Sequence, residues 1–236
     1  MLGAGGALAV FVIAATAVSR AEKTRTEERA APTRDAVAAS LLFHILTAGG
    51  TTSDAALREI RRGAGIGGPV TTEIDVANWA ESYARATNAQ QRSHLLETAV
   101  QLVAKREGPI PVRQYAALLD LSFGLGFHSD ALARLRQSYG FEYIDHAKNA
   151  RPRSADRGGS ENPLYSRDRS SAELLAVLGL SGTPTRQELS AAYRRLVAQH
   201  HPDRFHGAPE EAQTNAATRF IEITRAYEEL LLAYRD

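Results

Sequence analysis

One stretch decides how the C-terminal part of this chain folds: Gln187–Asp203, with the sequence QELSAAYRRLVAQHHPD. Its apolar residues recur three or four positions apart, at Leu189, Ala192 or Tyr193, and Leu196. This spacing predicts a helix with one apolar face. Pro202 ends the helix, because proline lacks the amide hydrogen that the next turn needs. The tripeptide His201-Pro202-Asp203 is therefore expected in a loop that follows an amphipathic helix.

Two further helices are expected beside this one. Ser170–Glu173 and Thr185–Glu188 both have the capping-box spacing that starts a helix, and Gly179 closes the short helix that the first box opens. The last helix is expected from about Asn215 to Ala233, with an apolar stripe at Phe220, Ile223, Tyr227 and Leu230. Residues 171–236 are thus predicted to form a small domain of one short and two long helices.

Four segments of this region match one known pattern: Leu178–Leu180, Ala192–Leu196, His200–Arg204 and Phe220–Glu228. Together they resemble the J domain, the module with which DnaJ-type co-chaperones engage a DnaK-type chaperone ATPase. The resemblance covers the whole segment and implies binding to such a chaperone, with no catalysis by the domain itself. The partner-binding residues that it implies are His201, Pro202, Asp203, Tyr193, Arg194, Arg195 and Arg204.

The chemistry of these residues suits docking. Pro202 restricts the loop, so less conformational freedom is lost on binding. Asp203 can pair with a basic group of the partner, and His201 can help to hold the loop. The arginines offer positive charge that steers encounter with an acidic surface, and the tyrosine should lie between core and contact surface. Ser190 and Ala198 depart from the family, in which the first position is commonly basic and the second often larger.

The N-terminus has a different character. Leu2–Ser19 contains no charged residue, and a helix of that length just spans the apolar core of a bilayer. Basic residues follow this run and none precedes it, which places the N-terminus outside and the rest of the chain in the cytoplasm. Residues 1–19 are therefore interpreted as a single-pass transmembrane anchor in the inner (plasma) membrane. Gly3, Gly5 and Gly6 have a small-residue spacing through which two anchors could form a homodimer.

Two alternatives remain for the apolar run. The small residues Ala15-Thr16-Ala17 would suit the cleavage site of a signal peptide, but the basic start that such a peptide needs is missing. A buried helix is the other alternative, because the run is only marginally long for a membrane span.

Residues 35–147 are predicted to form an all-helical domain, because helical periodicity recurs without a convincing strand pattern. A weak repeat with an offset of 75 residues pairs Val37 with Val112, Leu46 with Leu121, Gly49 with Gly124, and Gly65 with Gly140. Each copy is read as two helices joined by a glycine-containing turn, so that two hairpins bury their apolar faces together. The pattern is similar to the TerB-like helical domain. Its turns lack most of the carboxylates that a hard cation needs, so no metal is expected.

Residues 148–170 contain six Lys/Arg, three Asp/Glu and little to bury, which favours a flexible linker. The expected fold class is therefore all-α. The order is an anchor, a TerB-like helical domain, a linker and a three-helix J domain at 171–236. This order resembles that of the membrane-anchored DnaJ-like co-chaperones of the DjlA type.

Composition excludes several other functions. The chain has no cysteines, which rules out disulfides, cysteine zinc sites and cysteine nucleophiles. A net charge of +1 gives no case for nucleic-acid binding. Neither a nucleophile–base arrangement nor a phosphate loop is recognisable, so neither an enzyme nor a cofactor is expected. The leading hypothesis is a membrane-anchored co-chaperone that stimulates ATP hydrolysis by a cytoplasmic DnaK-type chaperone. The alternative is an envelope-stress adaptor that acts mainly through residues 35–147.

Overall fold

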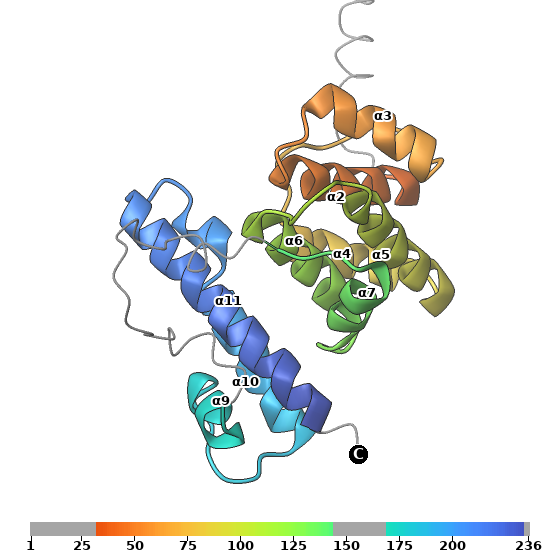
Figure 1. Cartoon of the computed structure of the whole chain (residues 1–236). Coiled ribbons are helices and arrows are strands. Elements are labelled where there is room, and N and C mark those ends of the chain that lie inside the picture. Colours follow the sequence, from red (N-terminus) through yellow and green to blue (C-terminus); the bar gives the residue numbers. More distant parts are fainter. Residues whose placement is uncertain (1–31, 144–168, 234–236) are drawn as a thin grey trace, which may run out of the picture. The chain divides into compact units, whose positions relative to one another are not determined.

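The computed structural model describes residues 32–143 and 169–233. Within these residues the regular elements are helices, apart from one isolated β-bridge between Ile110 and Tyr143, which confirms the all-α class. The helices, drawn in Figure 1, are α2 (Arg34–Ala48), α3 (Ser53–Gly63), α4 (Val76–Arg85), α5 (Ala89–Ala104), α6 (Val112–Gly124), α7 (Ala131–Tyr139), α9 (Ser171–Val177), α10 (Arg186–Gln199), the short 3-10 helix η2 (Pro202–Phe205) and α11 (Glu210–Ala233).

The helical region from α2 to α7 contains the two hairpins that the 75-residue repeat predicted. One hairpin is α2 and α3, the other is α6 and α7, and α2 packs directly against α6. The paired residues Leu46 and Leu121 are both fully buried. Between the hairpins in sequence, α4 and α5 pack against both α2 and α6. The paired hairpins are confirmed, whereas membership of the TerB-like family stays a prediction.

The paired glycines Gly49 and Gly124 mark places where the chain packs too closely for a side chain. A Cβ atom on Gly124 would lie 2.6 Å from both the Ala77 carbonyl oxygen and the Ala80 Cβ atom on α4. A Cβ atom on Gly49 would overlap the side chain of Gln114, which is fully buried on α6. Glycine recurs at this repeat position because both copies of the hairpin use it for close packing.

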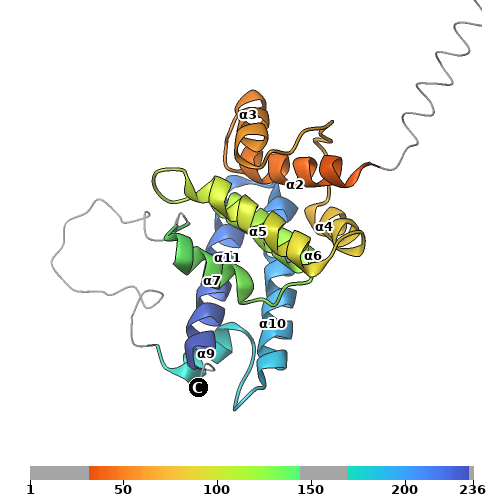
Figure 2. The ribbon, with the colours of Figure 1, turned by 90° about the vertical axis from the view of Figure 1, so that its right-hand side faces the viewer.

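The region from α9 to α11 has the three predicted helices. Both capping boxes are present: Ser170 and Thr185 each accept a hydrogen bond from the third residue of the helix, whose glutamate side chain accepts one in return. α11 packs against both α9 and α10, and Figure 2 shows α10 and α11 side by side. α11 begins at Glu210, earlier than the predicted Asn215. Its first turn carries two glutamates that favour the positive end of the helix dipole.

Two of the predicted segments cannot be compared with the structure. The anchor at residues 1–19 lies outside the described residues, and so does nearly all of the linker at 148–170. None of the described helices is both long enough and apolar enough to cross a membrane.

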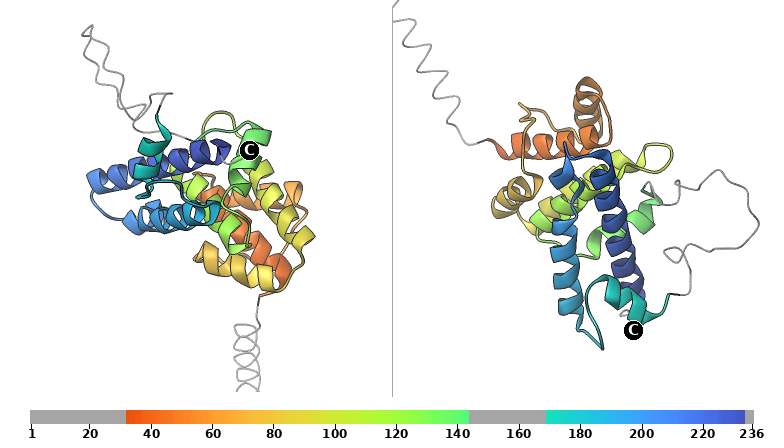
Figure 3. Two further views of the ribbon diagram at one scale, coloured as in Figure 1. Left: turned by 90° about the horizontal axis from the view of Figure 1, so that it is seen from below. Right: turned by 90° about the vertical axis from the view of Figure 1, so that its left-hand side faces the viewer.

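The α2–α7 region and the α9–α11 region pack against each other. Contacts group Arg34–Asp236 into one compact unit that contains both regions. Figure 3 gives two further views of the blue helices α10 and α11 side by side. At one part of the interface between the two regions, η2, which lies between α10 and α11 in the sequence, packs against α6. No sequence pattern indicated this packing, and it decides the surroundings of the His-Pro-Asp loop.

Candidate partner-binding site

The His-Pro-Asp loop has a fixed local shape. His201 precedes η2, and its Nδ1 atom accepts a hydrogen bond from the backbone N–H of Asp203 at 3.3 Å. Pro202 occupies the first position of η2, where an amide hydrogen would have no helical partner. Arg204 donates to the carbonyl oxygen of Ala198 at 3.1 Å, which ties the loop to the end of α10. The loop therefore needs little further ordering to bind a partner.

His201 is buried, although it belongs to a surface loop. Its side chain is only 9% exposed, and its Nε2 atom lies 3.1 Å from Asp120 Oδ2 on α6. The Nε2–H group is not well aligned with the carboxylate, so the contact acts mainly through charge. The imidazole ring also packs edge-on against Phe220 of α11, with 6.2 Å between ring centroids.

Charge and burial act in opposite directions on His201. Burial alone would lower the pKa of the imidazole, because it disfavours the charged form. The carboxylates of Asp120 and Asp203 outweigh burial and raise the pKa above its ordinary value of 6.5. On α2, His44 lies near the same charges, and burial lowers its pKa. His201 therefore keeps its positive charge to a higher pH than an ordinary histidine.

Asp203 is engaged by the same helix. Its Oδ1 atom accepts a hydrogen bond from Arg113 Nε at 3.1 Å, in a pair whose side chains are 40% and 50% exposed. Arg113 lies in the first turn of α6. A pair this exposed contributes about 0–1 kcal/mol. Asp203 was expected to pair with a basic group of the partner, and it already pairs with a basic group of its own chain. We call these contacts of His201 and Asp203 with α6 the loop contact.

The basic side of α10 is divided between the interface and the surface. Arg194 donates to the carbonyl oxygen of Phe127 at 3.1 Å, and its guanidinium lies 5.0 Å from the centroid of the Phe123 ring. Both of these partners belong to the α2–α7 region. Arg195 and Arg204 are exposed, so positive charge for steering remains at the surface.

Tyr193 lies at the boundary between the two regions. Its ring stacks on Tyr227 of α11, with centroids 4.0 Å apart, and meets Phe123 of α6 edge-on at 6.1 Å. Its side chain is fully buried, and burial raises its pKa, which keeps the phenol neutral. Tyr193 was expected to lie partly on a surface that contacts a partner. That surface is covered by the α2–α7 region.

A second contact between the regions centres on Glu228 of α11. Arg136 Nη2 on α7 donates to Glu228 Oε2 at 2.6 Å, and the Tyr115 hydroxyl on α6 donates to Oε1 at 3.0 Å. The arginine and glutamate side chains are 13% and 11% exposed. Burial raises the pKa of Glu228, although Arg136 and Tyr115 oppose the change. We call this arrangement the Glu228 contact.

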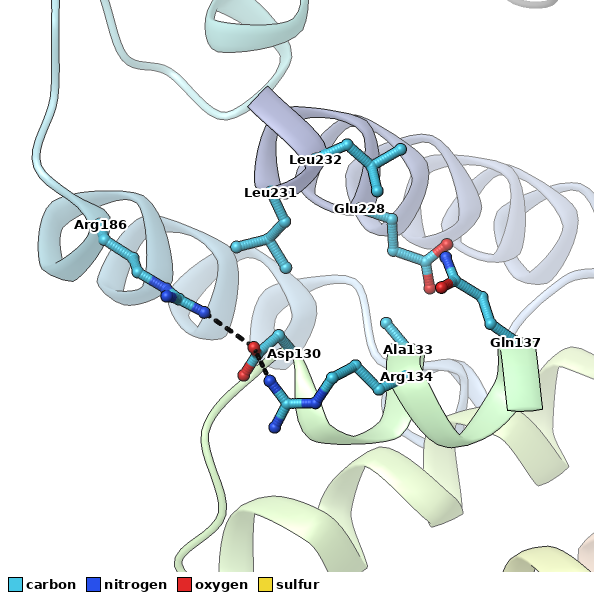
Figure 4. Close-up of a pocket in the computed structure, with 8 residues that line it drawn as sticks. All are labelled: Asp130, Ala133, Arg134, Gln137, Arg186, Glu228, Leu231 and Leu232. Atoms are coloured by element: carbon cyan, nitrogen blue, oxygen red, sulfur yellow. Dashed lines mark hydrogen bonds and ion pairs between the residues drawn. The ribbon is translucent and has the colours of Figure 1, made fainter. Parts of the chain in front are cut away.

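A pocket of about 210 Å³ lies beside the Glu228 contact (Figure 4). At its edge the Asp130 carboxylate accepts from two arginines, Arg134 on its own helix and Arg186 on α10, the latter at 2.8 Å. Its other lining residues are Ala133, Gln137, Glu228, Leu231 and Leu232. The pocket is lined by residues of both regions, so it belongs to the interface between them. Asp130 already pairs with both arginines of its lining.

The arrangement suits binding. Among residues 32–143 and 169–233, no group of three histidines, cysteines or acidic residues could hold a metal ion. The predicted residues Tyr193, Arg194, His201 and Asp203 come together at one interface, with Pro202 and Arg204 beside them. Arg195 lies apart from the described contacts with the α2–α7 region.

Sequence reasoning missed the residues that receive the loop, Arg113 and Asp120. It also missed Tyr115 and Arg136, which receive Glu228. One signal was available: Arg113 and Asp120 are seven residues apart, so they share a face of the helix predicted to start near Pro111. The complementarity of Arg113 and Asp120 to a loop about 80 to 90 residues later has no sequence signature.

Comparison with known proteins agrees with the geometry of the α9–α11 region. A family model described as the DnaJ domain matches residues 173–233. "Chaperone protein dnaJ 72" of Arabidopsis thaliana is 41% identical over 54 residues, which are 23% of this chain and 29% of that protein.

The similarity extends beyond that domain in other relatives. "Co-chaperone protein DjlA" of Vibrio cholerae is 30% identical over 126 residues, which are 52% of this chain and 44% of that protein. "Co-chaperone protein DjlA" of Shewanella oneidensis is 22% identical over 159 residues, 66% of this chain and 55% of that protein. The chain spans about half or less of the length of these relatives. No solved structure is significantly similar to it. Residues 173–233 thus match the DnaJ domain, and about half of the chain is similar to co-chaperones of the DjlA type.

Proposed function

We propose that this protein is a membrane-anchored J-domain co-chaperone that stimulates ATP hydrolysis by a cytoplasmic DnaK-type chaperone. The observation that carries the proposal is the preformed His201-Pro202-Asp203 loop, held between α10 and α11 in a region that matches the DnaJ domain. The anchor is residues 1–19, whose uncharged sequence supports insertion in a membrane.

A co-chaperone of this kind acts by selecting a conformation of its partner. It must bind the arrangement that hydrolyses ATP better than the resting arrangement, because equal binding to both would shift nothing. Asp203 supplies a carboxylate for a basic group of the partner. The exposed Arg195 and Arg204 supply charge that speeds encounter with an acidic surface.

The α2–α7 region is proposed to be TerB-like and to serve the same pathway. Its support is the repeat of two hairpins, together with similarity to DjlA co-chaperones over more of the chain than the DnaJ domain alone. The linker at 148–170 joins it to the J domain.

The test is single-turnover ATP hydrolysis by a DnaK-type chaperone, measured with and without the full chain at several-fold excess. Wild-type protein should raise the rate, and His201→Gln should return it to the rate of the chaperone alone. His200→Gln is the matched control, because it makes the same change one residue earlier, at the end of α10. We expect it to behave as wild type.

Circular dichroism should show that both variants keep the helical content of the wild type. Stimulation that survives His201→Gln would contradict the proposal. So would the absence of stimulation by the wild type and by the variants with an exposed loop described below. That result would favour the adaptor alternative.

A further inference from the structure

One face of α6 contacts both His201 and Asp203 of the loop. Arg113 and Asp120 are seven residues apart, two helical turns, so both side chains project from the same face. Arg113 pairs with Asp203 and Asp120 lies against His201. Each charge on the helix therefore faces a group of opposite charge on the loop. Arg113 faces Asp203, and Asp120 faces His201, which is positive when protonated.

A loop in this position is only partly available to another protein, because His201 is covered and Asp203 is already paired. Asp203 cannot accept a guanidinium from a partner in the direction that Arg113 occupies. The side chain of His201 is 9% exposed, because α6 and α11 cover it. Arg194, although exposed, already donates a hydrogen bond to the carbonyl oxygen of Phe127. A chaperone can reach His201 only if the loop leaves α6, and it must displace Arg113 to take its place on Asp203.

We propose that the face of α6 bearing Arg113 and Asp120 is a docking surface for the chain's own His-Pro-Asp loop, and that docking masks the loop from an external chaperone. The proposal rests on the proposed function, since masking matters only if the loop activates a chaperone. The apparent affinity for the chaperone is then reduced by the fraction of molecules in which the loop is undocked.

Contacts away from the loop hold the J domain in the masked position. The hydroxyl oxygens of Ser129, in the turn before α7, and Ser190, on α10, are in contact. A long side chain at position 190 would meet Ser129, so the small residue at this departure from the family suits docking. Arg186 adds an ion pair to Asp130, 2.8 Å away. These contacts lie on α10, outside the loop, and they offer a way to control docking without changing the loop.

The first experiment weakens docking. Arg113→Glu places a carboxylate opposite Asp203 and leaves the J domain unchanged. At a chaperone concentration below saturation, we expect stimulation of single-turnover hydrolysis to rise about two- to fivefold above wild type, as expected for the loss of an exposed ion pair. Arg58→Glu is the matched control, because Arg58 is exposed on α3, whose main contacts are with α2 and α5. It should leave stimulation at the wild-type level.

The second experiment locks docking. The chain has no cysteines, so Ser129→Cys with Ser190→Cys introduces one possible disulfide at side chains that already touch. The oxidised double variant should stimulate at least tenfold less than the same protein after reduction with dithiothreitol. Each single cysteine variant, treated with the same oxidant, controls for effects on the chaperone and should show no such change.

The outcomes separate the two proposals. If wild type stimulates but Arg113→Glu does not exceed it, and the oxidised protein is as active as the reduced protein, masking is wrong and the proposed function stands. If wild type, Arg113→Glu and the reduced double variant all fail to stimulate, the proposed function itself is wrong. A rise with Arg113→Glu and a reversible loss in the oxidised double variant establish masking.

Discussion

The loop contact and the Glu228 contact join the same two regions, yet they differ in burial and chemistry. In the loop contact, Asp203 and Arg113 are about half exposed, and the other pair depends on a histidine. In the Glu228 contact, Arg136 and Glu228 are almost completely buried and a tyrosine hydroxyl adds a second hydrogen bond. The structure thus separates the groups that a partner would need from the groups that hold the J domain in place.

This difference has an energetic consequence. An exposed ion pair contributes little, because water and salt screen both charges. Removing one partner from a buried pair is far more damaging, because it leaves a charge without compensation. The loop can therefore be released from α6 at low energetic cost, while separation of the whole J domain requires breaking the Glu228 contact.

The largest expected effect is at the Glu228 contact. Arg136→Met keeps much of the side-chain volume but leaves Glu228 buried without a cation, so the free energy of unfolding should fall by about 3–5 kcal/mol. Urea denaturation followed by the fluorescence of Trp79, the single tryptophan, measures this change.

The matched control is Arg113→Met, the same substitution at the loop contact. Its expected loss is about 0–1 kcal/mol, because both side chains of that pair remain accessible to water. Equal losses for the two variants would contradict the difference between the contacts.

A smaller effect is expected from pH at the loop contact. Because the pKa of His201 is raised in the folded protein, its stabilising contribution is fully present below the ordinary value of 6.5. It is lost as the pH rises through the folded-state pKa. The free energy of unfolding of the wild type should therefore exceed that of Asp120→Asn by a larger margin at pH 6.5 than at pH 8.5. The two margins should differ by about 0.5 kcal/mol. Urea denaturation of both proteins at the two pH values measures this difference.

Four charged or titratable groups surround His201. Asp120 faces it from α6, His44 lies near it on α2, and Asp203, which pairs with Arg113, lies on the loop itself. Burial lowers the pKa of His44, so its protonation opposes folding as the pH falls, in wild type and in Asp120→Asn alike. A difference between wild type and Asp120→Asn that does not change with pH would show that charge on His201 has no part in docking.

Much of the fold followed from local patterns. Ser170 and Thr185 form the predicted capping boxes, because a capping box is specified by residues three apart. The repeat predicted both hairpins, because periodic apolar residues and the glycines at 49 and 124 are needed for packing within one region. The start of α11 was placed too late, because its first turns carry few apolar residues.

The site could be predicted only in part. The His-Pro-Asp loop was found because its three residues are adjacent and its flanking helices are periodic. Its position against Arg113 and Asp120 depends on tertiary packing between residues about 80 to 90 apart, for which two charged residues on a helix surface give no specific signal. Glu228 was recognised as part of a motif, but its burial beside Arg136 came only with the structure.

The most direct test of the account combines release and inactivation in the full chain. Single-turnover ATP hydrolysis by the DnaK-type chaperone is measured with wild type, Arg113→Glu, His201→Gln and the double variant. The account predicts that Arg113→Glu exceeds wild type, and that adding His201→Gln returns the rate to that of the chaperone alone. A raised rate that persists in the Arg113→Glu, His201→Gln double variant would contradict it, because release would then act through something other than the loop.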